Sequence, residues 1–292
     1  PIIWTLHDMW AFTGGCHLTG GCDRFRESCG RCPKLGSSSI QDLSHKNWKR
    51  KDFAWKSLDM TIVCPSNWMA RECRQSSLLT HKSTLVIHNG IDLHRFRPQD
   101  RFAAREALGF PQDKFLIAFG ASAVLDQNKG HTILQDALRV FNSQEPESNC
   151  ELVVFGAGVQ NSSLFSVPTR NLGFITDDRQ LALIYSAADV FCAPSREENL
   201  ATTAIESLAC GTPVVAFNIG GFPDIIEHRV CGYLADPFNA QSFAEGLYYL
   251  FSRCRSSGAC TELRSEARRR AEALFDSRAI ARRHLEVYQG LL

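Results

Sequence analysis

The chain has 292 residues, a formal net charge of +1 and 44% hydrophobic residues. This charge balance argues against a nucleic-acid-binding protein, which carries a large basic excess, and the apolar content argues against disorder. No apolar run approaches the length of a membrane span, and no signal-peptide pattern opens the sequence, so we expect a cytoplasmic protein with reduced cysteines.

Short β-rich runs alternate with helical patterns along the chain. Strands are expected at 1–8, 60–66, 83–90, 114–120, 151–156, 189–194, 213–217 and 232–236. Helices are expected near 44–58, 129–144, 178–187, 202–210, 239–255 and 261–275. Continuous apolar strands separated by helices are typical of parallel sheets that are covered on both faces. The sequence therefore predicts a doubly wound α/β fold.

The segment 89–100 is the expected connection between two domains. It contains the turn pair Asn89-Gly90 and a proline among charged neighbours. A complete α/β set follows it, at 115–275, within an expected donor-binding domain at 97–275, whereas about three strands precede it, too few for a full doubly wound domain. We therefore expect a partial first domain at 1–96, truncated in this chain, and an amphipathic helix at 276–292 that crosses between both domains.

Two glutamates, Glu198 and Glu206, flank an expected strand-to-helix turn. Open α/β sheets bind ligands at the carboxyl ends of their strands, and the helix from Thr202 offers free N–H groups and a positive dipole end to a phosphate. The Glu206 carboxylate suits a ribose diol, and Glu198 suits another polyol. The same spacing also fits a helix capping box or a surface pair, so both interpretations stay open.

The segment 194–226, "PSREENLATTAIESLACGTPVVAFNIGGFPDII", closely resembles the donor site of retaining glycosyltransferases of family 4, which have the GT-B fold. Glu198 and Glu206 match the family's Glu-x7-Glu pair. Residues 211–215 match its Gly-Thr-Pro-Val-Val, and residues 220–224 match its Gly-Gly-x-Pro-Glu/Asp element. The resemblance extends to "FGASAVLDQNKG", "VCPSNWMA", "VIHNGIDLHRF" and "TLHD". It implies two Rossmann-like doubly wound domains that face a cleft, with the donor bound by the second.

The resemblance implies a role for several residues. Glu206 would hold the donor ribose, Glu198 the hydroxyls of the transferred sugar, and Lys129 would neutralise the diphosphate. His7 would reach the donor sugar from the first domain, although a histidine satisfied within the core is the alternative. Further donor contacts would come from Gly120, Asn199, Leu200, Ala201 and Thr202.

The activity implied by the resemblance is retaining hexosyl transfer. The donor would be a UDP- or GDP-linked sugar, and the acceptor a polysaccharide or a lipid-linked oligosaccharide, with no cofactor required for the chemistry and no nucleic acid as partner. One departure concerns the anion site. Ala121 and Ser122 stand where many members carry an arginine, and Asn128 precedes Lys129 where an arginine is frequent. We hypothesise that Arg196 compensates. The thinner cationic site and the truncated first domain leave a non-catalytic nucleotide-binding remnant or scaffold as the alternative.

Four of the twelve cysteines, Cys16, Cys22, Cys29 and Cys32, lie close together in a Gly-rich segment. The Cys-x2-Cys end has metal-ligand spacing, and four thiolates around one Zn²⁺ would brace such a loop. Reduced, partly buried cysteines or a redox pair are the alternatives. A similar "TGGCH" segment occurs in the colanic acid and exopolysaccharide subgroup of the family, so the resemblance points to that subgroup.

The segment 45–56, "HKNWKRKDFAWK", mixes basic and aromatic residues: Lys46, Lys49, Arg50, Lys51, Trp48, Phe53 and Trp55. This combination suits an anionic membrane surface, where a lipid-linked acceptor would reside, and predicts peripheral membrane contact. A solvated basic helix with its aromatic residues in the core is the alternative.

Overall fold

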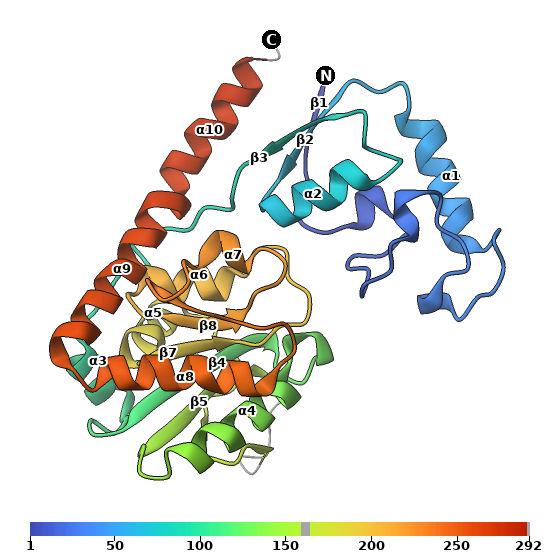
Figure 1. Cartoon of the computed structure of the whole chain (residues 1–292). Helices are drawn as coiled ribbons and strands as arrows, with labels where there is room; N and C mark the ends of the chain where they lie inside the picture. The colour runs from blue at the N-terminus through green and yellow to red at the C-terminus, as the bar shows by residue number, and fades with distance from the viewer. Residues whose placement is uncertain (159–163, 291–292) are drawn as a thin grey trace. The chain divides into compact units, whose positions relative to one another are not determined.

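The computed structural model describes residues 1–158 and 164–290, and the chain divides into two compact units (Figure 1). One unit is Pro1–Asn89 together with the carboxyl-terminal residues from Ile280 on, and the other is Gly90–Ala279. These boundaries differ by a few residues from those expected at 96/97 and 275/276. We call them the first and the second unit.

The second unit is built on a six-stranded sheet with the strand order β6-β5-β4-β7-β8-β9. All five strand pairs are parallel. The order places the topological switch between β4 and β7, where doubly wound sheets bind ligands. The strands are β4 (Phe115–Ala123), β5 (Cys150–Ala157), β6 (Thr169–Asn171), β7 (Val190–Ala193), β8 (Val214–Phe217) and β9 (Gly232–Ala235).

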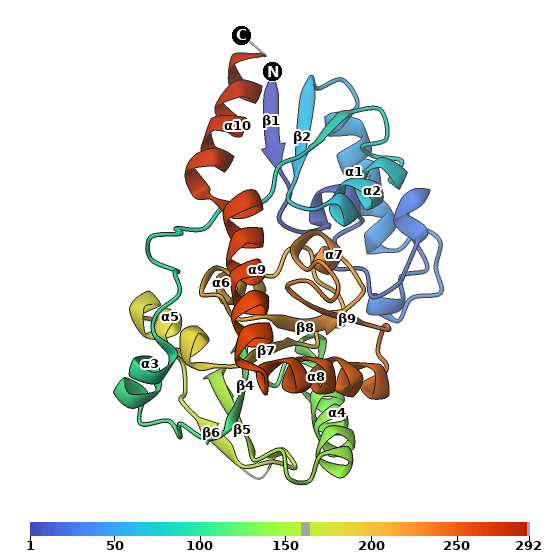
Figure 2. The ribbon, with the colours of Figure 1, turned by 60° about the vertical axis from the view of Figure 1, so that its left-hand side comes forward.

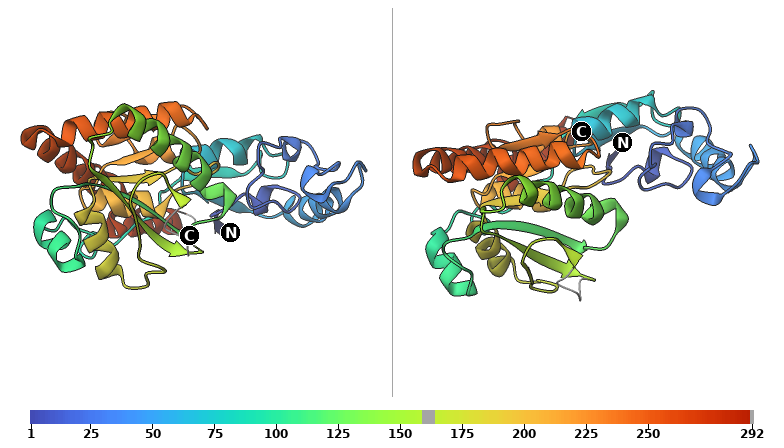
Figure 3. Two further views of the ribbon diagram at one scale, coloured as in Figure 1. Left: turned by 90° about the horizontal axis from the view of Figure 1, so that it is seen from below. Right: turned by 60° about the horizontal axis from the view of Figure 1, so that its bottom comes forward.

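Helices cover both faces of this sheet (Figure 3). They are α3 (Arg101–Leu108), α4 (His131–Gln144), α5 (Asp178–Ala187), α6 (Thr202–Ala209), α7 (Phe222–Ile225), α8 (Ala240–Cys254) and α9 (Ser257–Phe275). Alternate residues of β4 enter opposite cores: Leu116 and Ala118 pack with α5 and α6, whereas Ile117 and Phe119 pack with α4 and α8. This alternation is what a strand buried on both faces requires, and it confirms the predicted doubly wound α/β class.

The first unit contains a three-stranded parallel sheet in the order β1-β2-β3. Its elements are β1 (Ile2–Thr5), α1 (Leu43–Trp55), β2 (Met60–Cys64), α2 (Asn67–Gln75) and β3 (Ser83–Val86). The last helix, α10 (Ser277–Gln289), lies beside this sheet (Figure 2). Ile280 packs against Val63 and Ile87, and Arg283 Nη2 donates to the Val86 carbonyl at 2.9 Å. The carboxyl-terminal helix therefore completes the core of the amino-terminal unit.

Candidate functional site

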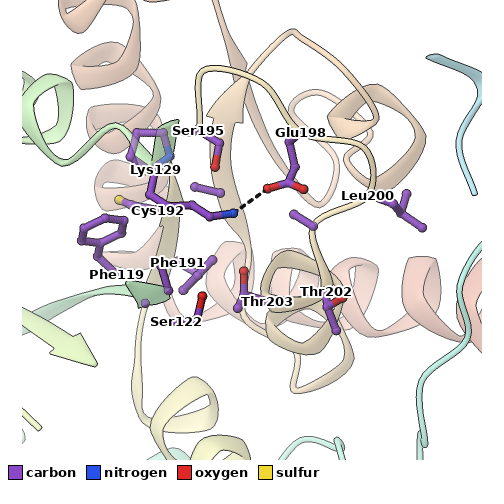
Figure 4. A pocket seen from close by; sticks show the side chains of 15 residues that line it. Phe119, Ser122, Lys129, Phe191, Cys192, Ser195, Glu198, Leu200, Thr202 and Thr203 are labelled. Carbon is purple, nitrogen blue, oxygen red and sulfur yellow. Dashed lines mark hydrogen bonds and ion pairs between the residues drawn. The ribbon is translucent and has the colours of Figure 1, made fainter. Parts of the chain in front are cut away.

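A cavity of about 270 Å³ opens at the carboxyl ends of β4 and β7, the switch point of the second unit (Figure 4). Its walls are the end of β4, the end of β7 with the loop that follows, and the start of α6. The lining residues are Phe119, Gly120, Ala121, Ser122, Lys129, Phe191, Cys192, Ala193, Pro194, Ser195, Glu198, Leu200, Ala201, Thr202 and Thr203. Six of the predicted site residues are among them: Gly120, Lys129, Glu198, Leu200, Ala201 and Thr202.

An ion pair between Lys129 and Glu198 crosses the cavity, with Nζ and Oε2 2.9 Å apart (Figure 4). Lys129 ends a short 3-10 turn, and the next residue, Gly130, has a φ of 73°. A Cβ at Gly130 would lie 1.9 Å from the Pro194 carbonyl oxygen, so only glycine permits this approach. The close approach of the two loops brings the lysine to the glutamate.

The Glu198 loop is fixed from its other side by the glycine pair 220–221. The Gly221 N–H donates to the Glu198 carbonyl at 3.1 Å, and a Cβ at Gly220 would lie 2.0 Å from that oxygen. Asn128 adds a third support, because its Nδ2 donates to the Glu197 carbonyl and its own carbonyl accepts from Arg196 N, both at 2.8 Å. The asparagine that replaces the family's frequent arginine thus braces the loop.

The start of α6 supplies the second feature of the cavity that suits an anion. Its N-cap residue, Ala201, has no side-chain cap, and Thr202 and Thr203 line the cavity. The amino-terminal N–H groups of a helix and its dipole favour a phosphate. Lys129 is the only cation among the described residues that line the cavity, and the Arg196 side chain is exposed outside this lining. Compensation by Arg196 stays a hypothesis.

Glu206 lies in α6 outside the lining of this cavity, half-buried, and accepts a hydrogen bond from the Tyr185 hydroxyl at 2.9 Å. The pKa of Glu206 is raised to about 7. Burial is the main cause and Asp178 adds to the rise, whereas the hydrogen bond from Tyr185 opposes it. Tyr185 was not predicted as a site residue. The sequence feature that could have indicated it is the tyrosine in the apolar run "LALIYSAADV", because a buried phenol needs a hydrogen-bond partner. Asn199 is buried and does not line the cavity.

His7 follows β1 in the first unit and is exposed, so its side chain does not lie within the core. Its predicted role toward the donor sugar stays a prediction. The neighbouring Asp8 accepts from Trp10 N at 2.7 Å and pairs with His17 Nδ1 at 2.8 Å, so its carboxylate organises the loop after β1.

The predicted zinc site at the four cysteines stays a prediction. Within residues 1–158 and 164–290, no group of three or more His, Cys, Asp or Glu residues could hold a metal ion. Burial raises the pKa of Cys29 to about 11, and the neighbouring Cys16, Cys22 and Cys32 add to the rise. The segment is held instead by hydrogen bonds, from Gly30 N to Ser44 Oγ at 3.0 Å and from Cys32 N to Asp42 Oδ2 at 2.7 Å. Cys16, Cys22 and Cys29 are partly buried, and Cys32 is buried.

The chain resembles known proteins in sequence. The family described as "Glycosyl transferases group 1" matches residues 100–271, more than half of the chain. The D-inositol 3-phosphate glycosyltransferase of Saccharomonospora viridis is 33% identical over 176 residues, which are 56% of this chain and 40% of that protein. The enzyme of the same name from Thermobispora bispora is 31% identical over 221 residues, 71% of this chain and 50% of that protein. The chain thus spans about half or less of the length of these relatives.

Solved structures agree on the fold. Sucrose-phosphate synthase from Thermosynechococcus elongatus superposes with a TM-score of 0.72 at 22% identity, over 99% of this chain and 67% of that one. Anabaena Alr3699/HepE in complex with UDP gives a TM-score of 0.72 at 21% identity, over 99% of this chain and 72% of that one. These likenesses confirm the predicted GT-B class with Rossmann-like parallel sheets.

Proposed function

The chain belongs to the glycosyl transferases group 1, and from this premise we propose that it transfers a sugar from a nucleoside diphosphate donor to an acceptor hydroxyl with retention of configuration. The observation that carries the proposal is the Lys129–Glu198 pair facing the start of α6 in one cavity. A cation, a helix start and a carboxylate at a switch point fit a diphosphate that bears a sugar.

Each group has a distinct task in this proposal. The diphosphate lies between Lys129 and the first N–H groups of α6, which meet the negative charge that builds as the sugar–phosphate bond breaks. Glu198 accepts hydrogen bonds from the hydroxyls of the transferred sugar, and Glu206 accepts those of the ribose. Lys129 must turn from Glu198 to the diphosphate when the donor binds, which leaves the Glu198 carboxylate for the sugar.

The donor and the acceptor are proposed at a finer level. UDP is the first nucleotide to test, because the HepE structures hold UDP, UDP with glucose, or UDP-glucose. For the acceptor we propose a polysaccharide or lipid-linked oligosaccharide of the exopolysaccharide subgroup, supported by the Cys-rich segment 16–32. The competing acceptor is an inositol phosphate, which the names of the curated relatives suggest. One transfer assay with both acceptor types separates these two assignments.

Calorimetric binding of UDP and GDP tests the donor site directly. We expect the wild type to bind one of them, and Glu206→Gln to weaken that binding by roughly 10- to 100-fold, because hydrogen bonds to a charged carboxylate are lost. Glu106→Gln is the matched control, an exposed glutamate of α3 in the same unit, and should bind as the wild type does. If the wild type bound neither nucleotide, the proposed donor site would be refuted and the non-catalytic remnant favoured.

Peripheral membrane contact is a second proposal, favoured by the exposed face of α1. Phe53 is 88% exposed. The exposed basic residues around it are Lys46, Lys49, Arg50 and Lys56. Trp48 and Trp55 pack against the core, and Lys51 is buried, with Nζ 2.9 Å from the Thr13 carbonyl and 3.6 Å from the Trp10 ring centre. The alternative of aromatic residues in the core therefore holds for the tryptophans. No helix in the described part of the chain is long and apolar enough to span a bilayer.

Vesicle flotation tests this face. We expect binding to phosphatidylglycerol vesicles that exceeds binding to phosphatidylcholine vesicles, and Phe53→Ser to weaken it roughly tenfold through loss of the inserted ring. Phe102→Ser is the control, an exposed phenylalanine of α3 that is 57% exposed. Equal binding to the two vesicle types, or equal losses for the two variants, would argue against the membrane proposal.

A further inference from the structure

We propose that Tyr185 is a positioning residue for the nucleotide ribose: its hydroxyl holds the Glu206 carboxylate in the orientation that accepts the ribose hydroxyls. The inference rests on the proposed function and deepens it. Its geometric basis is the hydrogen bond of 2.9 Å from the Tyr185 hydroxyl to Glu206 Oε2, which joins α5 to α6.

Tyr185 is held immobile from all sides. Its side chain is fully buried, and its ring meets those of Phe96, Phe155 and Phe191 edge-on, with centroids 6.5, 5.7 and 5.5 Å away. Its carbonyl accepts from Thr212 Oγ1 at 2.6 Å, which fixes the backbone as well. Packing of the ring fixes the position of the hydroxyl oxygen, so the carboxylate that it contacts has a defined orientation.

The hydrogen bond leaves Glu206 able to bind a diol. An ionised carboxylate has about four lone-pair sites, and the tyrosine occupies one of them. Two vicinal ribose hydroxyls require two more with a fixed plane, since both donors come from a rigid ring. A free glutamate would sample several rotamers, and part of the binding free energy would be spent on ordering it.

The tyrosine also favours the ionised form that the ribose needs. Burial opposes ionisation and raises the pKa of Glu206 to about 7. Near neutral pH, the Glu206 carboxyl group of the ligand-free protein is therefore divided between its protonated and ionised forms. Removing the hydroxyl removes a hydrogen bond to the charged form and raises this pKa further. The titratable and charged groups around the carboxylate are Asp178 and Tyr185 of α5, Cys210 at the carboxyl-terminal cap of α6, and Arg264 and Arg268 of α9 beside Cys210.

The experiment compares UDP with 2′-deoxyUDP, or the guanosine pair if the wild type prefers GDP, by calorimetry between about pH 6 and about pH 8. In the wild type we expect the 2′-hydroxyl to strengthen binding, and binding to weaken as the pH falls through about 7, the pKa of Glu206. Tyr185→Phe keeps the ring and its packing. It should lose roughly tenfold in affinity for UDP and little for 2′-deoxyUDP, and its midpoint should move to higher pH.

Two controls separate positioning from stability. Tyr249→Phe removes another tyrosine hydroxyl of the second unit, which donates to the Arg229 carbonyl at 2.8 Å, and should leave both affinities unchanged. In a Glu206→Gln background, Tyr185→Phe should cause no further loss of ribose discrimination, because the two side chains act as one unit.

The outcomes are distinguishable. The inference is overturned if Tyr185→Phe keeps the wild-type discrimination and pH midpoint, or if it weakens both nucleotides equally, as a purely structural role would. If the wild type binds neither nucleotide, or if Glu206→Gln binds as tightly as the wild type, the proposed donor site fails and this inference fails with it.

Discussion

Replacement of Lys129 by Met is expected to lower the rate of sugar transfer by about 10²- to 10³-fold, because the charge that develops on the departing diphosphate loses its cation. Among the described lining residues there is no second cation to take its place. The start of α6 remains and supplies the residual stabilisation. The loss should fall mainly on kcat, since the charge grows in the transition state.

A matched control for this substitution is present in the same unit. Lys114 pairs with Glu151 at 2.9 Å, with 27% of its side chain exposed, against 30% for Lys129. Lys114→Met removes an ion pair of the same length away from the cavity, where Glu151 keeps Arg170 as a partner at 3.0 Å, and should leave the rate unchanged. Single-turnover transfer from the labelled donor measures both variants. If Lys129→Met reacted within a factor of about two of the wild type, the assigned role of this lysine would be wrong.

The Lys129–Glu198 pair has a further consequence for the donor-free protein. Without a diphosphate, an unpaired Lys129 ammonium group would attract counterions from solvent. In this structure the Glu198 carboxylate pairs with it and holds it in place. In the proposed donor complex, the diphosphate competes with Glu198 for Lys129, and the released carboxylate becomes available to the sugar. The two exchanges offset each other in part, which preorganises the site at modest cost.

The fold was predictable because its strands are buried on both faces. Runs such as "FLIAFG" and "ELVVFG" are apolar throughout, and β4 and β5 lie where they were expected. The short edge strand β6, Thr169–Asn171, was missed because it is polar and no residue in it is buried. Its register with β5 comes from tertiary pairing, from Leu152 to Val154, and not from a local pattern.

The site was predictable only where the chemistry lies in local loops. Lys129 and Glu198 stand in segments that resemble known donor loops, and the glycines next to them show how those loops meet. Tyr185 was missed because its role depends on the approach of α5 to α6, which no spacing in the sequence encodes. Cysteine spacing likewise records distance along the chain and not the placement of the thiols, so the zinc site stays a prediction.

The largest loss of stability is expected from Arg105→Leu, because Arg105 neutralises a buried carboxylate at the end of the sheet opposite the cavity. Arg105 is 1% and Asp189 3% exposed, and Nη2 lies 2.7 Å from Oδ2. Asp189 also accepts from Leu116 N at 2.8 Å and from Arg101 Nη1 at 2.6 Å. Loss of one partner from a buried pair costs about 3–5 kcal/mol of unfolding free energy, since the other charge stays buried.

Denaturant unfolding followed by far-ultraviolet circular dichroism measures this loss. We expect the midpoint denaturant concentration to fall while the slope of the unfolding free energy against denaturant stays unchanged. Arg139→Leu is the control, because its ion pair with Asp136 is exposed on both sides and should contribute less than about 1 kcal/mol. The double variant Arg105→Leu/Asp189→Leu should recover part of the loss, because it leaves no buried carboxylate, and Arg101, which loses its partner, is 29% exposed. If Arg105→Leu were no less stable than Arg139→Leu, the argument would be contradicted.

The buried ion pair also bears on the cavity. Asp189 precedes β7 and accepts from the N–H of Leu116 in β4, and the opposite ends of these two strands line the cavity. Arg105→Leu should therefore also weaken nucleotide binding, although Arg105 does not contact the proposed ligand.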